Sequence, residues 1–208
     1  MATATVLGLT LTLTSPLLIA LRIAPLLGST ASLTHAYMEY ITTTSFNGRA
    51  PVHSRLCHFL LEKPYQPSTA PKNNEGLEQA KEKFVPAWFV KFFDTAVWSV
   101  VGLNSLTLYS TLSNLYLFPE GLAGSRTWYI CGLVAAISHY LFVPLVGWSV
   151  KRLYGMCAAQ ERDEKIDWEM SAVEIVREWA GWHRIRMCTV DVGAWVCFTV
   201  GVVKVISV

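Results

Sequence analysis

Two long stretches of the chain contain no charged side chain. Residues 95–118 and 127–150 are each 24 residues long and carry no Asp, Glu, Lys or Arg. Roughly 20 apolar residues suffice for a helix to cross the hydrocarbon core of a bilayer. The two ends of the chain are also mostly apolar, with Arg22 as the only charged residue of 3–33 and Asp191 and Lys204 as those of 187–208. We therefore predict an all-α fold, a polytopic membrane protein built as a four-transmembrane-helix bundle, with spans at about residues 3–33, 86–118, 127–150 and 187–208.

The composition agrees with a membrane protein. Hydrophobic residues make up 52% of the chain and charged residues only 15%, whereas an average soluble domain is about 25% charged. A net charge of +2, without a basic stripe interleaved with aromatic residues, argues against a nucleic-acid partner. No segment outside the spans has enough apolar periodicity to form its own core. We expect a single integral membrane domain over residues 1–208.

The distribution of Lys and Arg predicts the orientation. The connection between spans one and two carries seven of them, and so does the connection between spans three and four. The short turn between spans two and three has only Arg126, and the C-terminus has only Lys204. Basic residues concentrate on the cytoplasmic side of membranes. We expect a cytoplasmic loop at 47–83, a cytoplasmic connector at 151–186, and both termini in the lumen of the endoplasmic reticulum.

The first apolar stretch is predicted to be a retained helix. No basic residue precedes it and no clear small-x-small cleavage site follows it, so it differs from a secretory signal peptide. Ser15-Pro16 and Pro25 are expected to kink this helix. Arg22 is expected near one end, where its long side chain can reach the membrane surface.

The last apolar stretch contains an acid, Asp191. On a 100° helical wheel it shares a face with Arg184, Met187, Cys188 and Trp195. A carboxylate in hydrocarbon costs roughly 3 kcal/mol unless it faces a partner or a wet cavity, so Asp191 should point into the bundle. Two interpretations remain open at this point. Asp191 is either a structural ion pair with Arg184 or Arg186, or a catalytic acid beside Arg184 and His183.

Other polar residues within or beside the spans are further candidates. His139 lies in the middle of the third span and is either a functional imidazole or is satisfied by Ser138, Tyr140 or a carbonyl freed by Pro144. Glu39 lies four residues after His35, as an acid/base pair or as a solvated interfacial face. Asp94 is either a catalytic acid or an interfacial partner of Lys91. Asn104 is expected to form an interhelical hydrogen bond.

The chain gives little support for a metal or cofactor. His53, Cys57 and His58 are close in sequence, but no second ligand pair accompanies them. There is no Gly-rich phosphate loop, Gly-x-Ser-x-Gly elbow or Cys-x-x-Cys sequence. We expect acid/base chemistry without a cofactor, on a lipophilic small-molecule substrate that arrives through the membrane lipid.

Four segments resemble a known family. These are IAPLL in the first span, RTWYICGL opening the third, FVPLVGW late in the third, and GWHRIR leading into the fourth. Together they resemble the small four-helix fungal membrane proteins typified by the anthrone oxygenases of polyketide pathways. The chain departs from that family in span two (FFDTAVWSVVGLN) and after the span-three proline (PLVGWSVKRL). The resemblance implies a membrane-embedded tailoring enzyme, and related pathways use small membrane hydrolases that open epoxides.

Three hypotheses of function follow. In the first, an epoxide is hydrolysed or cyclised, with Asp94, Asp191 or Glu39 activating water and His139, His183 or Arg184 stabilising the epoxide oxygen. In the second, His139 deprotonates an anthrone, whose carbanion reacts with dioxygen. In the third, the protein is a scaffold for other pathway enzymes, and its polar groups pair with one another and leave no cavity.

Overall fold

The computed structural model describes residues 2–47, 59–60, 75–122, 124–164 and 169–207. Most of these residues form long helices; η1 and η3 are 3-10 turns, and η2 and η4 are π-helical turns. In chain order the elements are β1 (Ala2–Val6), β2 (Leu9–Leu13), α1 (Ser15–Thr44), η1 (Ser45–Asn47), α3 (Glu75–Leu112), η2 (Ser113–Leu117), α4 (Arg126–Ser138), η3 (His139–Phe142), α5 (Val143–Glu161), α6 (Ala172–Arg186), η4 (Met187–Asp191) and α7 (Val192–Ile206).

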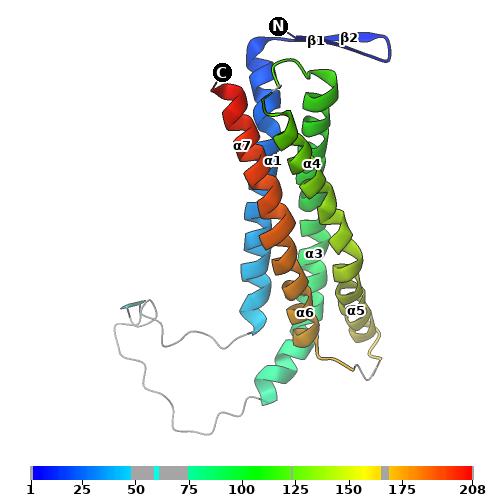
Figure 1. The fold of residues 1–208 in the computed structure, drawn as a ribbon. Helices are drawn as coiled ribbons and strands as arrows, with labels where there is room; N and C mark the ends of the chain where they lie inside the picture. The colour runs from blue at the N-terminus through cyan, green and yellow to red at the C-terminus, as the bar shows by residue number, and fades with distance from the viewer. Residues whose placement is uncertain (1, 48–58, 61–74, 123, 165–168, 208) are drawn as a thin grey trace.

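Four continuous helical stretches in the described part are long and apolar enough to cross a membrane. They are Ser15–Asn47, Gly76–Leu117, Arg126–Glu161 and Ala172–Ile206. They run alternately up and down, so that β1 and the end of α7 lie at the same end of the bundle (Figure 1). The predicted all-α four-helix bundle is confirmed, and the protein is a multi-pass membrane protein.

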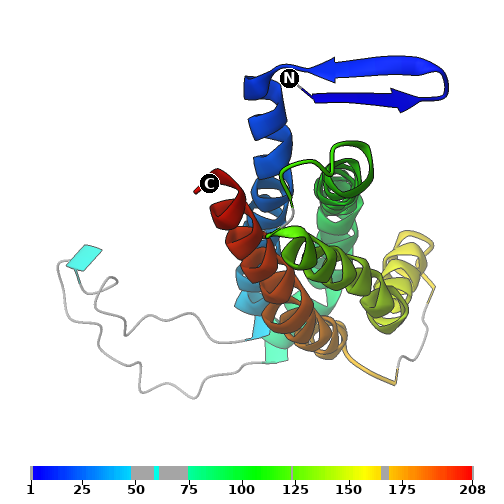
Figure 2. The same ribbon diagram turned by 45° about the horizontal axis from the view of Figure 1, so that its top comes forward.

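The start of the first span differs from the prediction. Residues 3–13 are not helical, because β1 and β2 pair as an antiparallel hairpin that extends to one side of the helices (Figure 2). Thr alternates with Ala or Leu in both strands, which is the period of two of a β-strand. The turn uses positive φ at Leu7 and Gly8, as tight hairpins do. Pro16 begins α1 instead of kinking it, since its missing N–H costs nothing in the first turn.

The other three predicted spans are shorter than the helices observed. The second helix begins at Glu75, and the fourth begins at Ala172 and not near residue 187. Ser171 and Glu174 form a reciprocal capping box that fixes the start of α6. Much of the predicted connector at 151–186 is therefore helix. Most of the predicted loop at 47–83 lies outside the described residues, as do His53, Cys57 and His58.

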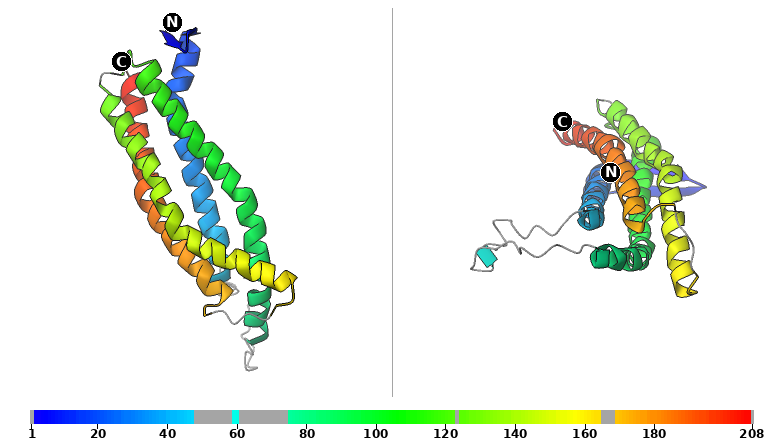
Figure 3. Two further views of the ribbon diagram at one scale, coloured as in Figure 1. Left: turned by 90° about the vertical axis from the view of Figure 1, so that its right-hand side faces the viewer. Right: turned by 90° about the horizontal axis from the view of Figure 1, so that it is seen from below.

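The helical path bends between α4 and α5, as Figure 3 shows. His139–Phe142 is a 3-10 turn, and Pro144 stands in the first turn of α5. Proline lacks an N–H and its ring crowds the preceding turn, so a break in the α-helical pattern just before it is expected. The bend places His139 where the helix changes direction.

Two hydrophobic clusters hold the bundle, and polar groups lie between them. Toward the end where α5 and α6 are joined, buried side chains of α3, α5 and α6 pack together, including Phe89, Leu153 and Trp179. Toward the end with the termini, Tyr129 and Phe198 are the largest buried side chains of a second cluster. In every span the buried polar residues that form the site described below lie between these two clusters along the chain.

Candidate functional site

The turn η4 determines which basic residue meets Asp191. A π-helical turn holds one residue more than an α-helical turn, so residues five apart share a face. Arg186 and Asp191 have this spacing; both are buried, and Arg186 Nε lies 3.3 Å from Asp191 Oδ2. Arg184 is exposed. The predicted face with Arg184 and Cys188 is therefore wrong, because it assumed a regular α-helix, whereas the alternative ion pair with Arg186 is present.

His139 is the second partner of Asp191. Its Nδ1 lies 2.9 Å from Asp191 Oδ1, and the two side chains are 6% and 8% exposed. With an ionised carboxylate Nδ1 is the donor, which leaves Nε2 as the ring nitrogen that can accept a proton. Ser138 and Tyr140, the partners considered from the sequence, do not bond the ring in the described part of the chain. The structure thus brings together two of the predicted site residues as an Asp–His pair.

Glu39 and His183 extend this cluster toward α1. His183 is fully buried, stacks on Trp179 and donates from Nε2 to the Ala36 carbonyl at 2.8 Å. Glu39 Oε2 lies 3.8 Å from His183 Nε2, and Glu39 Oε1 lies 3.6 Å from His35 Nδ1. Glu39 is buried, so the solvated interfacial interpretation of this residue is wrong.

The buried cluster combines two acids, one arginine and three histidines. Asp191 contacts His139 and Arg186, and Glu39 contacts His35 and His183. Burying a charge without a partner is expensive, and these contacts reduce that cost. Carboxylates in contact with imidazoles are groups that can exchange protons, which suits a site for acid/base chemistry.

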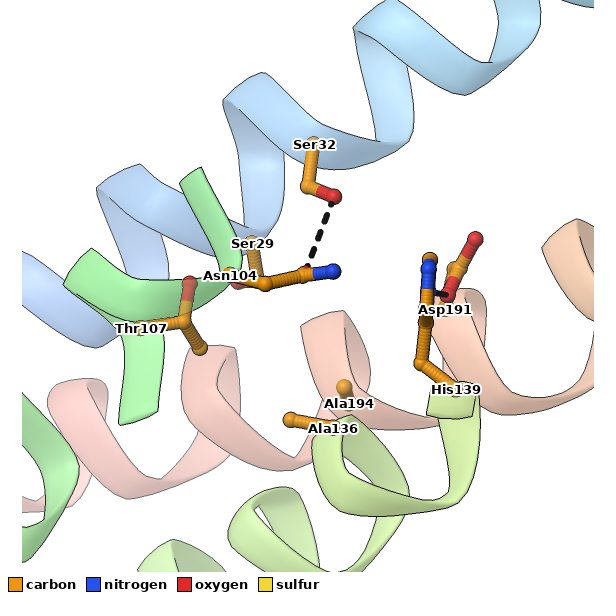
Figure 4. A pocket seen from close by; sticks show the side chains of 8 residues that line it. All are labelled: Ser29, Ser32, Asn104, Thr107, Ala136, His139, Asp191 and Ala194. Atoms are coloured by element: carbon orange, nitrogen blue, oxygen red, sulfur yellow. Dashed lines mark hydrogen bonds and ion pairs between the residues drawn. The ribbon is translucent and has the colours of Figure 1, made fainter. Parts of the chain in front are cut away.

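A small cavity lies beside the Asp–His pair, lined by all four spans. Its volume is about 10 Å³, which is roughly what one water molecule needs. Asn104 is 7% exposed, and its Nδ2 has no hydrogen-bond partner among the described residues. Figure 4 shows Asn104 and the His139–Asp191 pair on the wall of this cavity. The other lining residues are Ser29, Ser32, Thr107, Ala136 and Ala194.

Close helix packing fixes the side of the cavity formed by α1 and α3. A methyl group at Gly28 would overlap the Thr107 hydroxyl, so the two helices meet with no side chain between them. Ser32 Oγ lies 3.5 Å from Asn104 Oδ1, a long contact (Figure 4). Small residues allow membrane helices this approach. Asn104 is therefore held by packing, while its amide N–H₂ is left for a ligand or a water molecule.

Two predicted site residues lie away from this cluster. Asp94 is exposed on α3 and forms no ion pair with Lys91 in the described part of the chain. Arg184 is exposed on α6 and lines a different pocket. Sequence reasoning placed both inward because each stands near an apolar run, but both lie on the outward face of their helices.

A second buried polar cluster, at the end of the bundle with the termini, was not predicted. Arg22 is 4% exposed and donates to Asn114 Oδ1 at 2.9 Å and to the carbonyls of Phe118 and Glu120, both at 2.6 Å. Asn114 Nδ2 donates to the Leu21 and Ser110 carbonyls, and Tyr129 Oη donates to the Arg22 carbonyl. The expected path of Arg22 to the membrane surface is wrong, because Asn114 and two carbonyls that follow η2 accept its hydrogen bonds inside the protein.

Among the described residues, no group of three His, Cys, Asp or Glu side chains is arranged to hold a metal ion. The site consists of Glu39, His139, His183, Arg186 and Asp191, with Asn104 across the cavity. No protein-family model, curated protein or solved structure matches this chain.

Proposed function

We propose that the protein is a membrane-embedded tailoring enzyme that opens epoxides on lipophilic, polyketide-type metabolites by acid/base chemistry. The observation that carries this proposal is the His139–Asp191 contact beside a water-sized cavity, which is also lined by Asn104, whose Nδ2 has no hydrogen-bond partner among the described residues. Positioned water, a base and a hydrogen-bond donor are the groups that hydrolytic opening of an epoxide needs.

The reaction is balanced without a cofactor. His139 Nε2 takes a proton from the water molecule as the water oxygen bonds to an epoxide carbon. That carbon–oxygen bond of the epoxide breaks, and the epoxide oxygen, held by the Asn104 amide, receives the proton back from His139. Asp191 orients the imidazole and stabilises its charged form. A hydroxyl of the substrate in place of water would give a cyclic ether.

The size of the cavity sets a condition on this proposal. Room for one water molecule does not admit a substrate, so the helices must separate for an epoxide to reach His139. The lipid phase is the direct route for a lipophilic compound, and catalysis behind a movable barrier is common in enzymes.

The experiment follows oxygen from its source. The full-length protein in proteoliposomes is incubated in ¹⁸O-water with 9,10-epoxyoctadecane and, separately, with anthrone under ¹⁸O-dioxygen. Label from water in a diol supports epoxide hydrolysis. Label from dioxygen in an anthraquinone supports the second candidate, anthrone oxygenation, which would use the same His139 as base.

Matched variants separate catalysis from structural pairing. Asp191→Asn and His139→Ala are expected to lower turnover per folded protein by roughly 10²-fold or more, as loss of general acid–base groups does. A scaffold without catalytic activity would show no turnover in the parent. Two variants that fold and turn over like the parent would contradict the site assignment.

We also propose that the protein resides in the endoplasmic reticulum with both termini lumenal. Each long connection carries seven Lys and Arg residues, whereas the short turn between spans two and three carries one, and basic residues concentrate on the cytoplasmic side. Glycosylation sequons are placed in turn within the 47–83 loop and on a C-terminal extension. Modification of the extension alone is expected, and modification of the loop alone would reverse the orientation.

A further inference from the structure

A second and larger pocket lies between the C-terminal end of α1 and the middle of α6. Its volume is about 390 Å³, within the range of about 300–1,000 Å³ typical of small-molecule sites. Tyr40 and Thr44 line it from α1, and Asn47 lines it from η1. It lies outside the site described above, near the end of the bundle that carries both long connections (Figure 1).

On α6 the pocket is lined by an arginine at each end and by two small residues between them, here called the floor of the pocket. Arg177 and Arg184 are seven residues apart and Ala180 and Gly181 lie between them, so all four share one helical face. Two helical turns separate the arginines by about 10 Å along the axis. A Cβ added at Gly181 would meet no atom within 4 Å, so the floor is open to the pocket.

Three side chains of the pocket, Arg177, Arg184 and Asn47, have polar groups without partners within the described chain. Arg177 and Arg184 are exposed, and neither forms an ion pair with a described acid. Asn47 Oδ1 is buried and has no hydrogen-bond partner there. Because the two ends of an amide are assigned by their contacts, this group can equally present its N–H₂. Two guanidinium groups and an amide around one hollow favour a ligand with several anionic oxygens.

We propose that this pocket binds the phosphorylated headgroup of an anionic phospholipid. Guanidinium groups bind phosphate oxygens in a bidentate fashion, and basic pockets between transmembrane helices at the cytoplasmic side are suited to such headgroups. On each helix an exposed apolar side chain follows a lining residue in the sequence, about 100° further round the helix: Ile41 follows Tyr40, and Ile185 follows Arg184. These two isoleucines provide an apolar surface for the acyl chains of a lipid. A free phosphate ion has no acyl chains and would gain nothing from that surface.

The test measures binding of phosphatidylinositol 4-phosphate to the detergent-solubilised full-length protein, with phosphatidylcholine as the reference lipid. Arg177→Gln combined with Arg184→Gln is expected to weaken binding at least tenfold. Gly181→Leu is also expected to weaken binding at least tenfold, because the leucine side chain would occupy the space of the pocket above residue 181. Arg162→Gln is the matched control, because Arg162 is an exposed arginine near the end of α5 that meets α6.

The alternatives give different results. Equal weakening by Arg162→Gln would show diffuse surface charge and overturn the site. Displacement of the lipid by an equal concentration of inorganic phosphate would show a site for a soluble anion and overturn the lipid assignment. No preference over phosphatidylcholine would overturn both. Asp191→Asn should bind the lipid like the parent, so failure of the proposed reaction and failure of this inference are distinguishable.

Discussion

Two asparagines ten residues apart on the second span have opposite surroundings. Asn114 uses both ends of its amide, accepting from Arg22 and donating to two carbonyls. Asn104 is buried to a similar degree, yet its N–H₂ has no partner among the described residues and faces a cavity. A buried polar group that is fully bonded stabilises the fold, whereas an unbonded one costs about 1–3 kcal/mol. The difference indicates that the Arg22 cluster is structural and that the Asp191 cluster is available for a ligand.

The π-helical turns make the same distinction. Each of the two clusters lies at one of them, η2 or η4. In η2 the carbonyl of Phe118, just after the turn, accepts from Arg22. In η4 the turn directs Asp191 at Arg186 and His139, and a cavity remains beside the pair. Such turns often occur at functional sites, and a cavity lies beside the second.

The largest expected effect is on stability, from Arg22→Met. Three acceptors would lose their donor, and at roughly 1–3 kcal/mol for each group left unsatisfied the loss should be at least about 3 kcal/mol. Thermal unfolding in detergent would measure it. Turnover per folded protein should stay within about twofold of the parent, and a selective loss of activity would break the contrast between the clusters.

The two asparagines provide the next test, as a matched pair. Asn104→Leu should lower turnover about 10²-fold, as loss of one positioned donor does. Its stability should be unchanged or higher, because an unsatisfied group is removed. Asn114→Leu should do the reverse, with lower stability and normal turnover of the folded fraction. The same response in both variants would show that the two sites do not differ in kind.

A smaller effect is expected from Tyr129→Phe. The change removes one hydrogen bond, from Tyr129 Oη to the Arg22 carbonyl at 2.7 Å, while the ring keeps its T-shaped contact with Phe198. One such bond contributes about 1 kcal/mol. A melting temperature lowered by a few degrees with unchanged turnover would agree. A loss as large as that of Arg22→Met would show that the hydroxyl organises the whole cluster.

The four helices could be predicted from uncharged length alone, because hydrocarbon imposes that requirement on any span. The hairpin was missed because residues 2–13 are uncharged too, although their alternation of Thr with apolar residues carried the signal. His139 and Asp191 were predicted since each is costly in lipid. Only the π-helical turn determines that Arg186 and not Arg184 pairs with Asp191, and the sequence does not reveal that turn. Asn114 has no property in the sequence that distinguishes it from Asn104.

The positions of the two clusters along the chain also determine the order in which they can form during synthesis. All but one of the groups that bond around Arg22 come from the first 120 residues, and Tyr129 follows soon after. That cluster can be complete once two helices and the start of the third have left the ribosome. The pairing of His139 requires Asp191, and the pairing of Glu39 with a second histidine requires His183. The nascent protein is thus anchored at one end of the bundle before the groups of the proposed site meet, and a chain that stops short of the fourth helix leaves His139 without Asp191 and Glu39 with only His35 as a partner.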